Sequence, residues 1–124
     1  MQTATTMIYQ ILSNEEKLKG IEFFTNSIPE DSQKLEKLPV SRIVELQGDY
    51  GNYASNEPNT IRFDVQVDVW LKNQRDVEQY YYLFDSILRK QSWVNTYSSV
   101  EEDSDLNNAK RIIKRYTGTF RLEL

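Results

Sequence analysis

The sequence predicts an α+β protein with a mostly antiparallel sheet of about five strands and two helices packed on one face. Residues 60–71 alternate apolar and polar side chains without a break, which is the period of a strand with one buried face. Residues 74–91 repeat apolar side chains every three or four positions, which is the period of a helix. The predicted order is α-β-β-β-α-β-β, and a length of 124 residues predicts one domain spanning residues 1–124.

The first part of the chain predicts one helix and two strands. Apolar spacings predict a helix over residues 3–13, with Thr3 or Thr5 as its N-cap. Residues 14–20 are charged and end in Gly20, which predicts a loop or a frayed helix end. The elements expected next are a strand over 21–28 that ends at Pro29, a polar loop over 30–38, and a strand over 40–46.

Residues 47–59 predict a long irregular loop. They contain Gly48, Gly51, Pro58 and four further turn-forming residues. A connection of this length is uncommon in a small domain and is often functional or mobile. Within it, Tyr50 and Tyr53 are expected to be apolar anchors or contact residues.

The second half of the chain predicts a helix followed by a hairpin. Asn73 or Asp76 is a suitable cap for the helix over 74–91. The elements expected next are a strand over 93–100, an acidic turn over 101–108 and a final strand over 112–124, in which Gly118 marks a bulge or a close backbone approach. The strand pair before the helix and the hairpin after it favour antiparallel pairing, although the helix can also cross to a parallel neighbour.

Composition excludes several classes of function. The chain has no cysteine and no histidine, which removes Ser-His, Cys-His and most zinc designs. A formal charge of −4 disfavours a nucleic-acid-binding domain. No apolar stretch is long enough for a membrane span and no signal peptide is evident, so we expect a soluble intracellular protein. We expect no enzymatic activity, no cofactor and no metal.

The acidic residues do not form a recognisable site in the sequence. Asp64 and Asp68 share one face of a predicted strand about 13 Å apart, which is too far for a glycosidase pair, so we expect solvated charges. Residues 103–108 resemble the start of a calcium loop. However, Asn108 stands where glycine is required and Lys114 stands where glutamate is required.

Two further motifs each allow two interpretations. The basic segment 110–115 can contact a phosphate or an acidic partner. Alternatively it is edge-strand charge or pairs with the acids of residues 101–105, and this structural interpretation is favoured. Tyr80, Tyr81 and Tyr82 can stack on bases, but their spacing favours core packing for the first two, with Tyr82 facing elsewhere.

Trp70 lies on the polar side of the strand over 60–71. Tryptophan is enriched at the centres of protein interfaces, which favours a contact with another chain. Alternatively both faces of the strand are covered within the chain, for example by the loop over 47–59. Both interpretations stay open from the sequence alone.

Several segments together resemble a known family. They are residues 52–58 (Asn-Tyr-Ala-Ser-Asn-Glu-Pro), residues 63–70 (Phe-Asp-Val-Gln-Val-Asp-Val-Trp) before an amphipathic helix, residues 23–30 (Phe-Phe-Thr-Asn-Ser-Ile-Pro-Glu), and residues 115–121 (Arg-Tyr-Thr-Gly-Thr-Phe-Arg). In these segments the chain resembles the tail terminator, or tail completion, proteins of long-tailed bacteriophages. The helix over 3–13 and the element order agree with that fold.

The resemblance implies a non-enzymatic ring, typically a hexamer, on the head-proximal end of the tail tube. Such a ring stops tube polymerisation and joins the tail to the head connector, and it is assembled in the bacterial host cytoplasm before it becomes part of the virion. The implied partners are other copies of the chain, the tail tube protein and a head-completion protein. Genomic DNA only passes through the lumen, which is compatible with a net negative charge.

We expect subunit contacts through the loop over 47–59 and the polar face of the long strand. The candidate interface residues are Tyr50, Tyr53, Arg62, Gln66 and Trp70. On this view, Trp70→Ala impairs assembly and leaves the fold largely intact. The alternatives are a head-completion or stopper protein, and a free-standing intracellular module that binds a small ligand or peptide.

Overall fold

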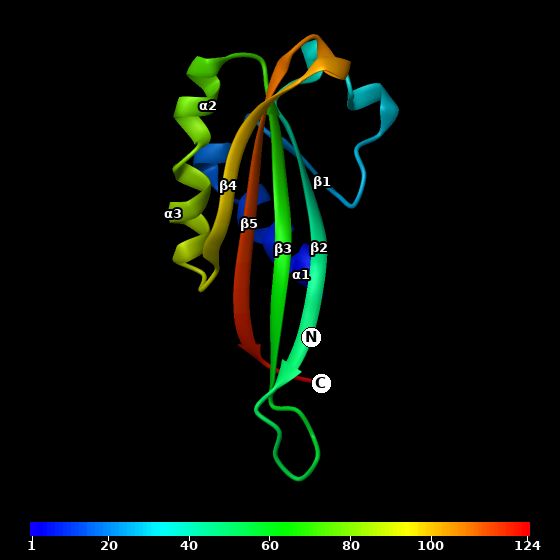
Figure 1. Ribbon diagram of the computed structural model, residues 1–124, viewed down its shortest axis with the longest axis vertical. Coiled ribbons are helices and arrows are strands. Elements are labelled where there is room, and N and C mark those ends of the chain that lie inside the picture. Colours follow the sequence, from blue (N-terminus) through cyan, green and yellow to red (C-terminus); the bar gives the residue numbers. More distant parts are fainter.

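Five strands form one sheet in the order β1-β2-β3-β5-β4 in the computed structural model, which describes residues 1–124 (Figure 1). The elements are α1 (Ala4–Ser13), β1 (Glu22–Thr25), β2 (Val40–Gly51), β3 (Thr60–Leu71), α2 (Gln74–Tyr80), α3 (Leu83–Arg89), β4 (Val94–Asp103) and β5 (Ala109–Arg121). Only β1 and β2 pair in parallel, and every other pair is antiparallel. The α+β class and the mostly antiparallel sheet are therefore confirmed.

The connections explain the strand order. β2 and β3 form one hairpin, and β4 and β5 form a second. The second predicted helix is divided into α2 and α3, and it leads from β3 to β4. Because β5 lies between them, β4 runs in the same direction as β3 but is not its neighbour. The alternative of a crossover from this helix to an adjacent parallel strand is therefore excluded, since the only parallel neighbours are β1 and β2.

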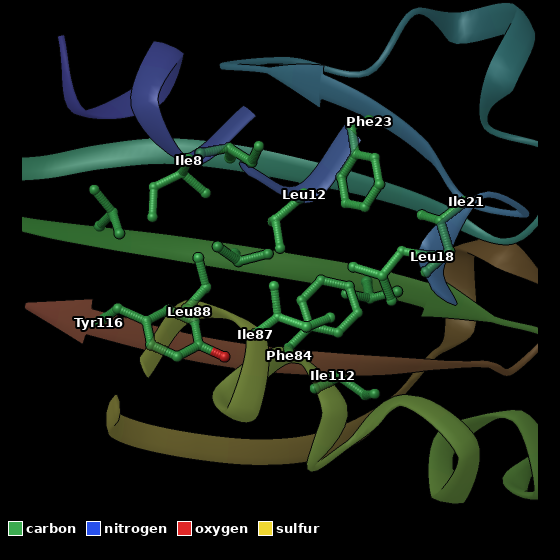
Figure 2. Packing of buried hydrophobic residues seen from close by; sticks show 14 of the residues in the cluster. Ile8, Leu12, Leu18, Ile21, Phe23, Phe84, Ile87, Leu88, Ile112 and Tyr116 are labelled. Atoms are coloured by element: carbon green, nitrogen blue, oxygen red, sulfur yellow. The ribbon is translucent and has the colours of Figure 1, made fainter. Parts of the chain in front are cut away.

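All three helices pack on one face of the sheet, which we call the inner face. Figure 2 shows side chains of α1 and α3 meeting the apolar side of the strands, with Ile8, Leu12, Phe84 and Leu88 among them. The inner side chains of β3 are nearly all buried, as the alternating pattern predicts: Phe63, Val65, Val67, Val69 and Leu71. Burial of each such side chain stabilises the fold by roughly 1.5–3 kcal/mol.

The long loop is shorter than predicted, because β2 continues to Gly51. Gly48 lies opposite Phe63, and a Cβ at Gly48 would lie in ordinary van der Waals contact with that ring, 3.5 Å away. The connection is therefore only residues 52–59. Within it, Ala54 and Glu57 exchange two backbone hydrogen bonds. Ser55 and Asn56 both have positive φ, 51° and 68°, as in a type I′ turn.

The predicted acidic turn over 101–108 is also shorter, because β4 extends to Asp103 and β5 begins at Ala109. Opposite charges face each other across this hairpin. Glu102 pairs with Lys110 at 2.7 Å, and Glu101 pairs with Arg111 at 3.2 Å. β5 lies between β3 and β4 and is not an edge strand, so the edge-strand interpretation of the basic segment is wrong. The pairing of this segment with the acids is confirmed for these two pairs.

Two smaller predictions also need correction. β1 ends at Thr25 because Asn26 has a φ of 70° and donates its N–H to the carbonyl oxygen of Ile43, which closes the parallel pair. Gly118 marks no bulge, since β5 pairs with β3 in continuous register. Space is the constraint there, because a Cβ at Gly118 would lie 2.8 Å from the Trp93 ring.

Candidate functional site

Asp68 lies on the outer face of the sheet, opposite the helices, and its carboxylate is fully buried. Arg42 on β2 donates to Oδ2 at 2.8 Å, and Arg111 on β5 donates to Oδ1 at 3.0 Å. Gln66 adds a third donor at 3.1 Å. The prediction of a solvated charge is therefore wrong for Asp68. The strand register places Arg42 directly opposite Asp68, and two guanidinium groups compensate the buried charge.

Trp70, the next outer residue of β3, is buried within the chain with only 8% of its surface exposed. Its Nε1 donates to Asp103 at 2.9 Å. The guanidinium carbons of Arg42 and Arg111 lie 5.5 and 5.1 Å from the ring centroid, within cation–π range. The apolar side chains packed around it are Leu38, Val40 and Ala109. Trp70 is therefore covered by residues of its own chain. The covering residues are these, and not the loop after β2.

A groove of about 240 Å³ opens beside Trp70. Arg42, Asp103 and Asp105 supply its charged lining, and Ile28 and Leu106 supply part of its apolar lining. Ligand pockets usually have volumes of roughly 300–1,000 Å³. A larger hollow of about 510 Å³ lies between α1 and α3, but only four of its twelve lining residues are hydrophobic. Neither therefore has both the size and the apolar lining of a typical small-molecule site.

A second buried charge lies on the inner face, and sequence reasoning missed its partners. Lys114 on β5 is fully buried, and its Nζ lies 3.0 Å from Asp85 Oδ2 on α3. The same ammonium lies 3.7 Å from the centroid of the Tyr81 ring, at the break between α2 and α3. Tyr116 donates its hydroxyl to the other oxygen of Asp85 at 2.7 Å. Lys114 lies on the apolar side of β5, together with Ile112 and Tyr116. A lysine at such a position was the sequence signal that could have revealed this buried charge.

Burial, with the hydrogen bond to Asp85 as a second cause, raises the pKa of Tyr116 far above the ordinary value of 10.0. Because the folded pKa exceeds the unfolded pKa, this stabilisation is complete below about pH 10 and is lost as pH rises further. We expect Tyr116→Phe to cost about 1–2 kcal/mol at pH 7 and to flatten the fall in stability above pH 10. Urea unfolding from pH 7 to 11 measures both effects.

Tyr82→Phe is the matched control, since Tyr82 is 76% exposed and should leave the alkaline slope unchanged. An unchanged slope in Tyr116→Phe would contradict the assignment of the shift to this hydroxyl. The pKa of Tyr80 is also raised, by burial and by Asp76, so Tyr80 contributes to the slope that remains.

The end of the β2–β3 hairpin, residues 44–62, carries most of the exposed candidate residues. Tyr50 and Tyr53 are 58% and 65% exposed. Arg62 pairs with Asp49 on the neighbouring strand at 2.9 Å and with Asp64 on its own strand at 3.6 Å. β1 pairs only with Val40–Ile43, so the edge of β2 from residue 44 to 51 has no partner strand.

The five predicted interface residues do not form one site. Tyr50, Tyr53 and Arg62 lie on the hairpin end, whereas Trp70 lies eight residues from Arg62 along β3, about 26 Å away. Gln66 lies between them and contacts Asp68 and Arg115 within the chain. The accessible part of the predicted interface is therefore the hairpin end.

Neither a metal centre nor a similarity to a characterised protein points to another site. No group of three or more His, Cys, Asp or Glu side chains is arranged to hold a metal ion. No helix combines the length and the apolar character needed to cross a membrane. The sequence matches neither a model of a known protein family nor a curated protein.

Proposed function

We propose that the protein is a non-enzymatic assembly protein of a phage tail, which forms a ring on the head-proximal end of the tail tube. The observation that carries the proposal is the accessible hairpin end. In Figure 1 the β2–β3 hairpin runs past the ends of all three helices. Three of its large apolar side chains are exposed to solvent: Leu46, Tyr50 and Tyr53. Exposed aromatic residues on a projecting element are suited to contact between subunits.

Two other observations support this function. The α+β class agrees with the fold implied by the resemblance to tail terminator proteins. The net charge of −4 disfavours retention of DNA, which must slide through the ring. In this role the partners are identical subunits, the tail tube protein and a head connector protein, and the protein resides in the virion.

Electron microscopy of tail tube protein polymerised with and without this protein tests the function. We expect ring-shaped caps at one end of each tube and shorter tubes as the protein concentration rises. Uncapped tubes of unchanged length would contradict the proposal. Binding to a head connector without any binding to tubes would favour a head-completion or stopper protein instead.

The double variant Tyr50→Ala/Tyr53→Ala is expected to fold normally and to assemble poorly. Both rings are mostly in solvent, so the free energy of unfolding should change by no more than about 0.5 kcal/mol. Loss of two aromatic contacts per subunit should weaken association at least tenfold. Sedimentation velocity measures the association, and Tyr82→Ala is a control in which an exposed tyrosine away from the hairpin is removed. Equal assembly of both variants would exclude the hairpin end as a contact.

The groove beside Trp70 favours a second candidate, a free-standing module that binds a small ligand or peptide. The volume of the groove, about 240 Å³, is small for such a ligand. Two of its lining residues, Trp70 and Asp103, are already hydrogen-bonded to each other. A protein that stays monomeric under every condition and binds a small ligand saturably would favour this candidate.

A further inference from the structure

We infer that the hairpin end of one subunit docks between α1 and α3 of another copy of the chain. The contact rests on the proposed ring, for which it names the surface that receives the hairpin end. That surface is the hollow of about 510 Å³ between the two helices, which we call the helix groove.

The floor of the helix groove is apolar. Met7 and Ile11 lie one helical turn apart on α1, Leu83 and Ile87 lie one turn apart on α3, and all four line the groove. Three of them are only partly buried, although they pack against the main core cluster: Met7, Ile11 and Leu83. A cavity of about 150 Å³ holds a benzene ring, so the groove has room for an aromatic side chain of a partner.

The polar rim of the helix groove has a net positive charge. Lys17 and Lys90 line the groove, and both side chains are exposed. Neither is among the lysines that form ion pairs in this chain. Glu15 is the one acid of the lining, and it accepts a hydrogen bond from the backbone N–H of Lys17 at 3.5 Å. The two ammonium groups are therefore available to an acidic partner.

The hairpin end has the complementary chemistry. Residues 44–59 contain three acids and neither lysine nor arginine. Asp49 binds Arg62, whereas Glu45 and Glu57 are exposed and form no ion pair. The exposed apolar side chains of the same segment are Leu46, Tyr50 and Tyr53. An apolar segment with free acids therefore matches an apolar floor with a basic rim, and the charges orient the contact.

The hairpin end and the helix groove meet only between copies of the chain. No residue of the hairpin end lines the groove of its own subunit, and the hairpin runs past the ends of the helices in Figure 1. Each subunit therefore offers one hairpin end and one groove. Contacts between two different surfaces build rings when the rotation closes, whereas a two-fold contact between two hairpin ends stops at a dimer and sets like charges together.

Reversal of the two rim charges tests the receiving surface. Lys17→Glu/Lys90→Glu should keep the fold, because both side chains are exposed, and this is checked by circular dichroism. It should weaken ring formation roughly tenfold or more, because it sets acids against Glu45 and Glu57. Sedimentation velocity measures the association. If the reversal unfolds the chain, Lys17→Gln/Lys90→Gln takes its place and should weaken association in the same direction.

Lys34→Glu/Lys37→Glu is the matched control. It changes the net charge by the same amount at two exposed lysines outside the groove, so it should form rings as the unmodified protein does. An equal loss in this control would show that net charge, and not the helix groove, governs association.

An exchange of charges tests the pairing itself. Glu45→Lys/Glu57→Lys should also weaken ring formation, because it sets lysines against Lys17 and Lys90. In one chain, the four substitutions together restore opposite charges across the contact, so ring formation should return to within about threefold of the unmodified protein. Rescue of this kind requires that the hairpin end faces the groove, and a merely structural role of either surface would not produce it.

The outcomes separate the docking contact from the proposed ring. Rings that form equally well in Lys17→Glu/Lys90→Glu, or that are not restored by the exchange, would overturn the docking contact and leave the ring intact. Normal rings of Lys17→Glu/Lys90→Glu that no longer cap tubes would assign the groove to the tail tube protein instead. Absence of rings in the unmodified protein, with tail tube protein present, would overturn both the contact and the ring.

Discussion

Trp70→Ala is expected to lower the free energy of unfolding by about 3–5 kcal/mol, the usual cost of removing a buried aromatic side chain. The indole fills the centre of the small outer cluster and lies beside Arg42 and Arg111. Its removal leaves a cavity and frees Asp103 from the Nε1 hydrogen bond. Urea unfolding followed by circular dichroism gives the change, since Trp93 complicates fluorescence.

This expectation replaces the sequence-based one, in which Trp70→Ala spares the fold. Trp70→Phe is the companion variant, because it keeps most of the apolar volume and loses the hydrogen bond, so about 1–2 kcal/mol is expected. If Trp70→Ala unfolds at the same urea concentration as the wild type and fails only in assembly, the indole is an interface residue and the structural interpretation is wrong.

Asp68→Ala is expected to cost about 3–5 kcal/mol, because it leaves two arginines beside a buried site without their shared carboxylate. Arg111 keeps Glu101 as a partner, but Arg42 has no other ion pair. The outer face should then lose its order around Trp70. Chemical denaturation at pH 7 measures the loss.

Asp64→Ala is the matched control. Asp64 lies on the same face of the same strand but is partly exposed, and its contact with Arg62 is longer, at 3.6 Å. A surface pair of this kind contributes up to about 1 kcal/mol. Equal losses for Asp64→Ala and Asp68→Ala would show that the burial of Asp68 between two arginines has no energetic consequence.

The main strand and helix faces of the fold were predictable because apolar residues recur there with a regular period in the sequence. The alternation in residues 60–71 predicts the buried face of β3, and the spacing in 74–91 predicts the apolar face shared by α2 and α3. The extension of β2 was not predictable from composition, because turn-forming residues such as Gly48 and Asp49 are held in the strand by pairing with Phe63 and Arg62.

The candidate site was predictable only in part. The exposure of Tyr50 and Tyr53 follows from their place near a turn. The burial of Asp68 and Trp70 does not follow from the alternation of one strand, because it depends on which residues the neighbouring strands bring to the same face. Arg42 and Arg111 are 26 and 43 positions away from Asp68 in the sequence, and only the sheet register brings them to it.

Native mass spectrometry of the protein at rising concentration, alone and with tail tube protein, tests most directly whether identical subunits close into a ring. In the proposed ring, the hairpin end with its exposed Tyr50 and Tyr53 contacts the neighbouring subunit. We expect one closed oligomer of fixed subunit number in the presence of tail tube protein, and its loss in Tyr50→Ala/Tyr53→Ala. A strict monomer at every concentration and with every tube preparation would contradict the proposed ring.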